Sequence, residues 1–201
     1  NPAYAGSRGT LSIGVLGRTQ WVGIDGAPKT ATLAVHAPVG RNLAAGFSAI
    51  SDTYGPVSEQ NIYADISYTI STSEEGRLAF GLKGGVSLFD VGLLSAILPQ
   101  TLPGDDPLFA DNVNEVFPNF GAGAYYYNER FYVGLSVPNI LETKHLEKSG
   151  NSITRAAEET HAFLTAGYVF YLTDNLKFKP STMLKGVAGS PLSVDVSANF
   201  L

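Results

Sequence analysis

The residue types that most often carry catalysis or bind metals are scarce and widely spaced in this sequence. It contains no cysteine among its 201 residues, and its histidines are His36, His145 and His161. A zinc site or an activated nucleophile needs partners at a short and defined spacing, which these histidines lack. The absence of cysteine also excludes disulfides and thiolate chemistry. The sequence therefore predicts no catalytic, metal-binding or cofactor-binding site, and we expect a protein that is not an enzyme.

Two further patterns resemble ligand-binding loops but lack the required context. The acidic stretch 104–115 does not have the regular spacing of a calcium-binding loop, so we expect a solvated external loop. Glycines in 81–85 and 121–123 lie within alternating segments and do not open a helix, as a phosphate-binding loop would. We expect these glycines to permit curvature or close packing inside the protein.

The overall composition bounds the class of protein. A net charge of -5 and a pI near 5.1 provide no basic surface for phosphates, so we expect no binding to nucleic acid. Charged residues make up 15%, against 22 glycines, 10 tyrosines and 11 phenylalanines, which favours strands and turns over helices. No apolar run reaches the length of about 18 residues that a transmembrane helix needs. Because composition does not shift along the chain, residues 1–201 are expected to form one domain.

Apolar and polar residues alternate with a period of two in several segments, which is the pattern of a strand with two different faces. In 61–71, isoleucine, alanine and tyrosine fill one face, while asparagine, aspartate, serine and threonine lie on the other. The segments 77–88 and 192–200 show the same division. Weaker versions of the pattern bring the total to about ten strands of barrel length. The remaining strands are expected at 10–21, 30–38, 42–52, 118–127, 130–137, 161–171 and 176–185.

The polar face decides between a soluble and a membrane protein. Alternation alone fits both, because a soluble sheet turns its apolar face inward and a membrane barrel turns it outward. Small residues and ions of both signs share the polar face, which suits the interior of a barrel. The ions are Arg18, Asp65, Arg77, Lys83, Arg130, Lys177, Lys179, Lys185 and Asp195. The three lysines near the end of the chain could bind an anion, but we favour pairing with acidic side chains.

The positions of the aromatic residues and the lengths of the connections also favour a membrane barrel. Aromatic residues gather near strand ends, where a barrel carries its interfacial girdles, although ordinary core packing would explain them equally well. They are Trp21, Tyr54, Tyr125, Tyr126, Tyr127, Phe131, Tyr168, Phe170 and Tyr171. Tight connections at 128–129 and 173–175 are expected to be periplasmic turns, and the long segments 91–117 and 138–160 extracellular loops. The charged part of the second loop, 142–159, could hold a short helix. The fold class that we predict is an all-β, antiparallel transmembrane barrel of a bacterial outer membrane.

Several segments resemble the PorP/SprF family of type IX secretion in Bacteroidota. The similarity is carried by Asn1-Pro2-Ala3-Tyr4-Ala5-Gly6-Ser7, by Arg18-Thr19-Gln20-Trp21, by residues 23–30 with Gly26 and Pro28, and more weakly by residues 132–139. We expect a structural role for these residues. By parity Arg18 and Gln20 should face the interior, Trp21 should lie at a membrane interface, and Pro28 should rigidify the return into the second strand.

The resemblance implies an outer-membrane barrel of the secretion and gliding machinery. Such a protein would bind, anchor or help to export cargo, such as a surface adhesin, through a C-terminal sorting domain. Its other partners would be outer-membrane lipid and further type IX secretion components of the outer membrane and of the periplasmic ring. Family members generally continue for several more strands, so this chain is expected to be an incomplete part of a larger barrel.

Two other interpretations remain open at this point. A transport barrel would use the interior lysines and glycines as the wall of a path for small or hydrophobic solutes. A soluble barrel or sandwich would place the apolar face inside and bind a small ligand there.

Overall fold

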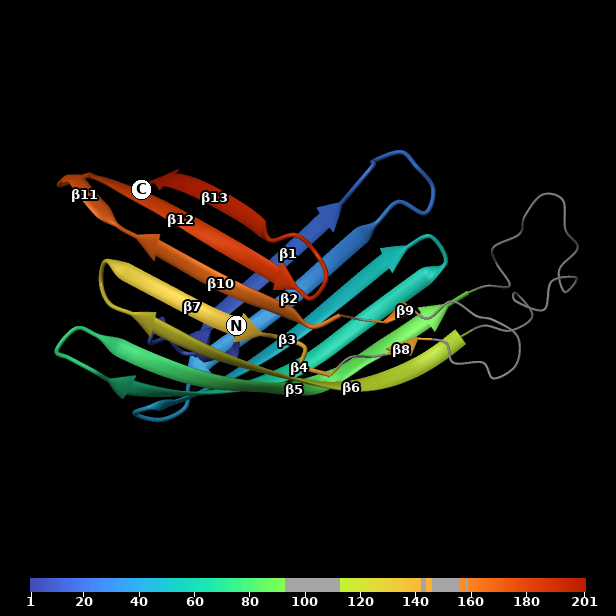
Figure 1. Cartoon of the computed structure of the whole chain (residues 1–201), viewed down its shortest axis with the longest axis horizontal. Helices are drawn as coiled ribbons and strands as arrows, with labels where there is room; N and C mark the ends of the chain where they lie inside the picture. The colour runs from blue at the N-terminus through green and yellow to red at the C-terminus, as the bar shows by residue number, and fades with distance from the viewer. Residues whose placement is uncertain (93–112, 142–143, 146–155, 158) are drawn as a thin grey trace, which may run out of the picture.

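One curved antiparallel sheet of eleven strands dominates the structure, which is a computed structural model (Figure 1). It describes residues 1–92, 113–141, 144–145, 156–157 and 159–201. A single-turn 3-10 helix, η1 (Pro2–Tyr4), precedes the sheet, and β8 (Lys144–His145) pairs with β9 (Ala156–Ala157) apart from it. The strands of the sheet are β1 (Ser12–Thr19), β2 (Lys29–Pro38), β3 (Leu43–Tyr54), β4 (Val57–Ser71), β5 (Arg77–Val91), β6 (Val113–Tyr127), β7 (Phe131–Val137), β10 (His161–Tyr168), β11 (Phe170–Thr173), β12 (Leu176–Val187) and β13 (Ser193–Phe200).

The predicted strands are all present, although their bounds differ by up to five residues. The strand predicted at 161–171 is divided at Val169 into β10 and β11, which both pair with β12. The strand predicted to begin at residue 118 begins at Val113, so the loop prediction is wrong for 113–117. Asn114 and Glu115 broke the apolar pattern there, but they pair with Asp90 and Phe89 across the ladder. The predicted short helix and the rest of both long loops fall mainly outside the described residues.

Two ends of the sheet differ in the length of their connections. At the end that we call the turn end, 39–42, 72–76, 128–130 and 174–175 join the strands. At the opposite end, the loop end, the connections are 20–28, 55–56, 92–112, 138–160 and 188–192. The predicted tight connections near 128–129 and 173–175 thus share the turn end, and the two long connections share the loop end, which also has the two-residue connection 55–56.

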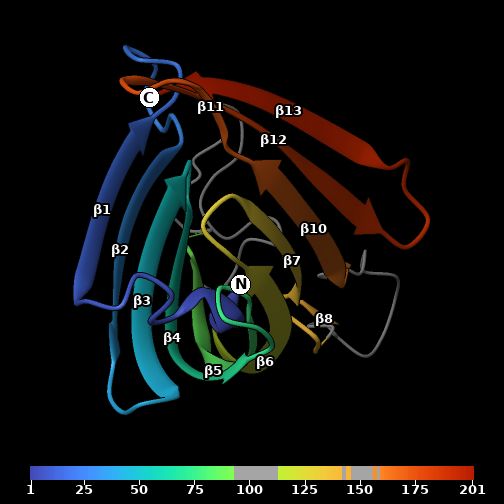
Figure 2. The same ribbon diagram turned by 90° about the vertical axis from the view of Figure 1, so that its left-hand side faces the viewer.

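The sheet curls so that β13 returns toward β1, and the N-terminal segment lies inside the curve (Figure 2). β1 pairs only with β2, and β13 only with β12, so the two edge strands do not pair with each other. The observed sheet is therefore open, as an incomplete barrel would be.

Burial assigns the two faces of the sheet. Ser67 and Asn119, which point to the inside of the curve, are each 1% exposed, whereas Ile66 and Leu82 on the outside are 51% and 63% exposed. Polar side chains are thus inside and apolar ones outside, the reverse of a soluble protein. The membrane interpretation of the alternation is confirmed, and the soluble alternative is wrong.

The apolar side chains on the outside of the sheet form a band, and this band is about as high as the hydrocarbon interior of an outer membrane is thick. On β5 the outward positions run from Leu78 to Leu88 before Asp90 interrupts them. At about 3.3 Å per residue and a strand tilt of about 40°, that segment spans roughly 25 Å of membrane. No helix in the described part of the chain is long and apolar enough to cross a membrane.

The outer face carries a row of aromatic rings at the turn end. Ring centroids are 4.6 Å apart between Tyr168 and Phe170, 6.3 Å between Phe170 and Phe178, and 5.0 Å between Phe178 and Phe200. Such a row at the edge of the apolar band is typical of an interfacial girdle. Tyr125 and Tyr127, by contrast, lie on the inner face, so the sequence prediction of girdle residues holds only in part.

Candidate functional site

The N-terminal segment, residues 1–9, covers part of the inner face of the sheet. Asn1 caps η1 by accepting a hydrogen bond from the Ala3 backbone N–H at 3.0 Å. Its side-chain Nδ2 donates to the carbonyl oxygens of Ala124 on β6 (3.2 Å) and Leu135 on β7 (3.3 Å). Because a capping residue satisfies backbone groups that η1 leaves unpaired, Asn1 fixes both the local turn and its place on the sheet.

Glycines on the inner face allow the segment to approach the strands closely. A Cβ atom at Gly81 would lie 2.2 Å from the Ala3 backbone nitrogen, and one at Gly123 would lie 2.2 Å from Asn1 Oδ1. The Ser67 hydroxyl donates to the Ala3 carbonyl oxygen at 3.3 Å. Glycine is therefore required where η1 rests on β5 and β6, which confirms close packing as the role of these glycines.

Tyr4 and Gly6 attach the segment to the neighbouring walls. The ring of Tyr4 makes edge contacts with His36 (centroids 5.6 Å apart) and Tyr125 (5.4 Å). The Gly6 backbone N–H donates to His36 Nδ1 at 3.1 Å, and Gly6 adopts a φ of 74°. The Tyr4 hydroxyl accepts a hydrogen bond from Arg8 Nε at 3.3 Å, which raises the pKa of the Arg8 guanidinium. That group stays charged at any physiological pH.

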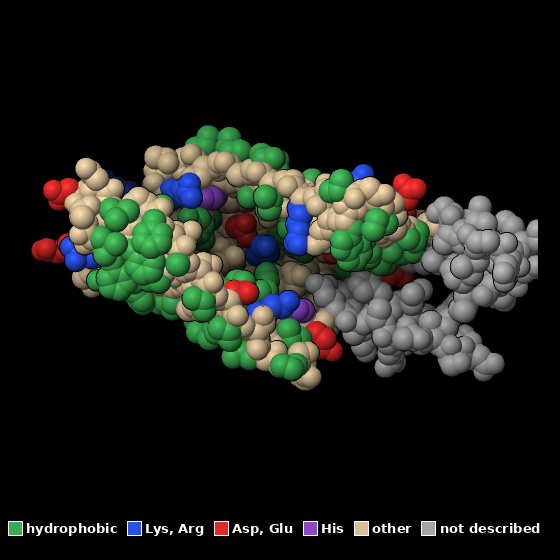
Figure 3. All heavy atoms as spheres, turned by 90° about the horizontal axis from the view of Figure 1, so that it is seen from above, with side chains coloured by type: hydrophobic (Ala, Val, Ile, Leu, Met, Phe, Trp, Pro, Cys, Tyr) green, Lys and Arg blue, Asp and Glu red, His purple; other side chains and the backbone are tan. Residues whose placement is uncertain are grey.

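A hydrogen-bonded network lies beyond the segment, toward the loop end. Asn61 Oδ1 accepts hydrogen bonds from the hydroxyls of Tyr63 (3.1 Å) and Ser87, and Asn61 Nδ2 donates to Glu59 Oε1 at 2.9 Å. Lys83 Nζ lies 4.4 Å from the centroid of the Tyr63 ring. These groups are on adjacent β4 and β5, and Figure 3 shows charged side chains of both signs within the hollow.

The second group of family-motif residues lies at the loop end, away from the N-terminal segment. These residues are Arg18, Gln20, Trp21, Gly26 and Pro28. Arg18 pairs in register with Thr30, and the Gln20 backbone N–H donates to the Pro28 carbonyl oxygen at 2.9 Å. Trp21 has a φ of 47° and is 68% exposed. The Gly26 carbonyl oxygen accepts a hydrogen bond from the Gly55 N–H at 2.8 Å, which joins this connection to the next turn.

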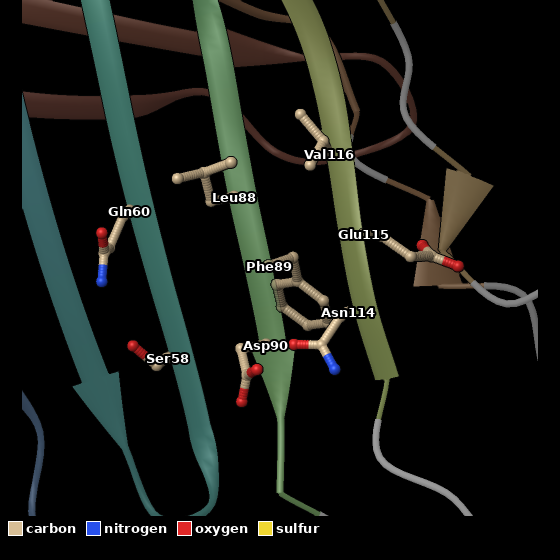
Figure 4. A pocket seen from close by; sticks show the side chains of 8 residues that line it. All are labelled: Ser58, Gln60, Leu88, Phe89, Asp90, Asn114, Glu115 and Val116. Atoms are coloured by element: carbon tan, nitrogen blue, oxygen red, sulfur yellow. The ribbon is translucent and has the colours of Figure 1, made fainter.

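Two hollows of about 240 Å³ lie near opposite ends of the sheet. The first is at the loop end, where β4, β5 and β6 extend past the apolar band, and Figure 4 shows the side chains that line it. They are Ser58, Gln60, Leu88, Phe89, Asp90, Asn114, Glu115 and Val116. The second, beside the N-terminal segment at the turn end, includes Arg41, Arg77 and Tyr127.

The sequence did not predict that the opening motif lies inside the sheet. A feature of the sequence that could have indicated this packing is glycine at inward positions of adjacent strands. Gly81 pairs with Gly123, and the absence of side chains there leaves room for a second layer of backbone. In the described part of the chain, no group of three or more histidine, cysteine, aspartate or glutamate residues could hold a metal ion.

An antiparallel sheet with an outer apolar band, an interfacial aromatic row and a polar interior defines a transmembrane barrel protein. The model of the family described as type IX secretion system membrane protein PorP/SprF matches residues 1–201, and the chain belongs to this family. It is therefore an outer-membrane component of type IX secretion. Comparisons with curated proteins and with solved structures found no match.

Proposed function

We propose that the protein binds, anchors or helps to export cargo proteins that carry a C-terminal sorting domain. The observation that carries this proposal is the grouping of both long connections, 92–112 and 138–160, at the loop end. They join strands that are adjacent in the sheet, β5 with β6 and β7 with β10. Binding residues tend to lie on long loops held by a rigid scaffold, and the connections at the turn end are too short for this.

The strand extensions at the loop end add to the same surface. Ser58, Asp90 and Asn114 pair in register at outward positions beyond the apolar band, so in our proposal this part of the sheet stands outside the lipid. In our proposal the loop end faces the cell exterior and the cargo, and the turn end faces the periplasmic components of the machinery. Polar groups that project past a membrane boundary are suited to recognising a protein.

We also propose that the opening motif is structural. Asn1, Pro2, Tyr4 and Gly6 hold the N-terminal segment on the inner face, where it occupies space that a solute would need. Arg18, Gln20, Trp21, Gly26 and Pro28 shape the first connection at the loop end. This arrangement favours binding over the alternative function, the transport of small or hydrophobic solutes.

Co-purification from native outer membranes in mild detergent tests the proposal. One variant carries a short Gly-Ser linker in place of residues 93–112, and a matched control carries one in place of the turn 72–76. We expect a secreted protein with a C-terminal sorting domain to co-purify with the wild type and the control, and to be lost from the 93–112 variant. Quantitative mass spectrometry measures the recovery.

Recovery of each barrel in the membrane fraction shows that it has assembled. Equal cargo recovery from both variants would contradict the role of the loop end. Recovery of the wild type as a lone barrel, together with selective solute flux in liposomes, would favour transport instead.

A further inference from the structure

Three basic residues at the turn end lie against tyrosine rings on the inner face; we call them the basic mouth. They are Arg130, Lys177 and Lys179. The Arg130 guanidinium carbon and Lys177 Nζ lie 5.3 Å and 4.8 Å from the centroid of the same ring, Tyr171. Lys179 Nζ lies 5.2 Å from the centroid of Tyr132. Three positive charges, one from the connection 128–130 and two from β12, thus converge on two rings.

The pairing of the interior lysines with acidic residues, which the sequence favoured, is not seen here. Within the described part of the chain, the cations of the basic mouth contact aromatic rings and form no ion pair with a carboxylate. The nearest acidic residues in sequence, Glu129 and Asp174, lie in the exposed flanking turns. Tyr171 is 50% exposed, so the site is open to a partner.

This arrangement leaves strong hydrogen-bond donors available. A ring attracts a cation through its face but accepts few of its N–H groups, whereas a guanidinium has five donors and an ammonium three. Two cations over one ring also repel each other, and an anion placed between them would remove that repulsion. Charge-assisted hydrogen bonds to a carboxylate are about twice as strong as neutral ones. An anionic group is therefore the ligand that this cluster fits.

The spacing of the two lysines indicates the shape of the ligand. Lys177 and Lys179 are two residues apart on β12, which places their Cα atoms about 6.6 Å apart. Alternate side chains of an extended peptide have the same spacing. Lipid would meet the outer aromatic row of Phe170, Phe178 and Phe200, whereas the basic mouth is on the inner face.

We propose that the basic mouth binds an extended segment of a partner protein with acidic residues at alternate positions. The site is at the opposite end of the sheet from the connections assigned to cargo, so the proposal goes beyond that function and does not depend on it. Arg130 would contact a third carboxylate or the peptide backbone.

Fluorescence anisotropy with the purified full chain in detergent tests the proposal. The probe is a labelled peptide, Gly-Asp-Thr-Asp-Thr-Asp-Gly, and its matched control has asparagine at each aspartate. We expect the acidic peptide to bind at least about tenfold more tightly than the control, because each charge-assisted hydrogen bond adds substantially to affinity. The double variant K177Q/K179Q is expected to lose at least about tenfold in affinity for the acidic peptide.

Lys185 provides the control variant, since it lies on the inner side of the same strand near the loop end. K185Q is expected to bind the acidic peptide as the wild type does. Equal binding of the two peptides by the wild type would overturn the proposal even if the double variant did not fold. An equal loss in K185Q would show a diffuse charge effect, and full competition by inorganic phosphate at matched concentration would show a small-anion site; either result would overturn the peptide assignment.

Discussion

Gly81→Ala should release the N-terminal segment from the inner face. The new Cβ would lie 2.2 Å from the Ala3 backbone nitrogen and 2.3 Å from the Pro2 carbonyl carbon, neither of which is a flexible side-chain end. Release of the segment loses four hydrogen bonds to the sheet, made by Asn1 (two), Ala3 and Gly6. At about 1 kcal/mol each, they set the destabilisation at up to about 4 kcal/mol.

Limited proteolysis and urea unfolding of the protein in detergent measure this effect. Gly17→Ala is the matched control, because a Cβ at Gly17 on β1 would meet nothing within 4 Å. We expect the segment to be cleaved rapidly in Gly81→Ala and slowly in Gly17→Ala, with a lower urea midpoint only in the former. If the two variants show the same cleavage rate and the same midpoint, the close packing of η1 on β5 does not hold.

Three further predictions test other parts of the structure. Asn1→Ala removes the cap and two hydrogen bonds to the sheet, so it should cost about 1–3 kcal/mol in urea unfolding; an unchanged midpoint would contradict the contacts described for Asn1. Leu82→Arg places a charge on the outward apolar band and should destabilise the protein in lipid vesicles by about 2–4 kcal/mol, whereas Asp90→Arg, beyond the band on the same strand, should cost little. Equal losses of unfolding free energy in the two variants would contradict a membrane boundary between Leu88 and Asp90. Trp21 is the only tryptophan, so its emission reports one place: we expect quenching by probes at headgroup depth and weak quenching by probes at the bilayer centre.

Alternation made the sheet predictable wherever a strand crosses lipid. In β4 and β5 one face meets hydrocarbon and the other the polar interior, so every second residue is constrained to be apolar. The constraint ends where the strand leaves the membrane. Residues 113–117 were therefore predicted to be a loop, although their backbone pairs fully with β5. At 113–115, which pair with β5 beyond Leu88, the prediction failed because an extramembrane strand needs backbone pairing but no apolar face.

The inner face was harder to predict than the outer one. Parity placed Lys83 and Asp65 inside, but it could not show that residues 1–9 lie there, because that packing depends on contacts between distant parts of the chain. The tyrosines at 125–127 show the same limit. All three were grouped as interfacial aromatics, yet their alternation directs Tyr125 and Tyr127 inward, where the rings of Tyr4 and Tyr132 contact Tyr125.

The place of Asn1 on β6 and β7 also orders the steps of folding. Asn1 is 123 positions away from Ala124 in the chain and 134 positions away from Leu135. Its hydrogen bonds to them therefore close two long loops. Closing such a loop costs about 4 kcal/mol of chain entropy, which a few contacts on a partly formed sheet cannot offset. The N-terminal segment can therefore dock only after β4 to β7 have paired. Residues 1–9 therefore reach their final position late in folding, and their protection from protease reports that β4 to β7 have paired.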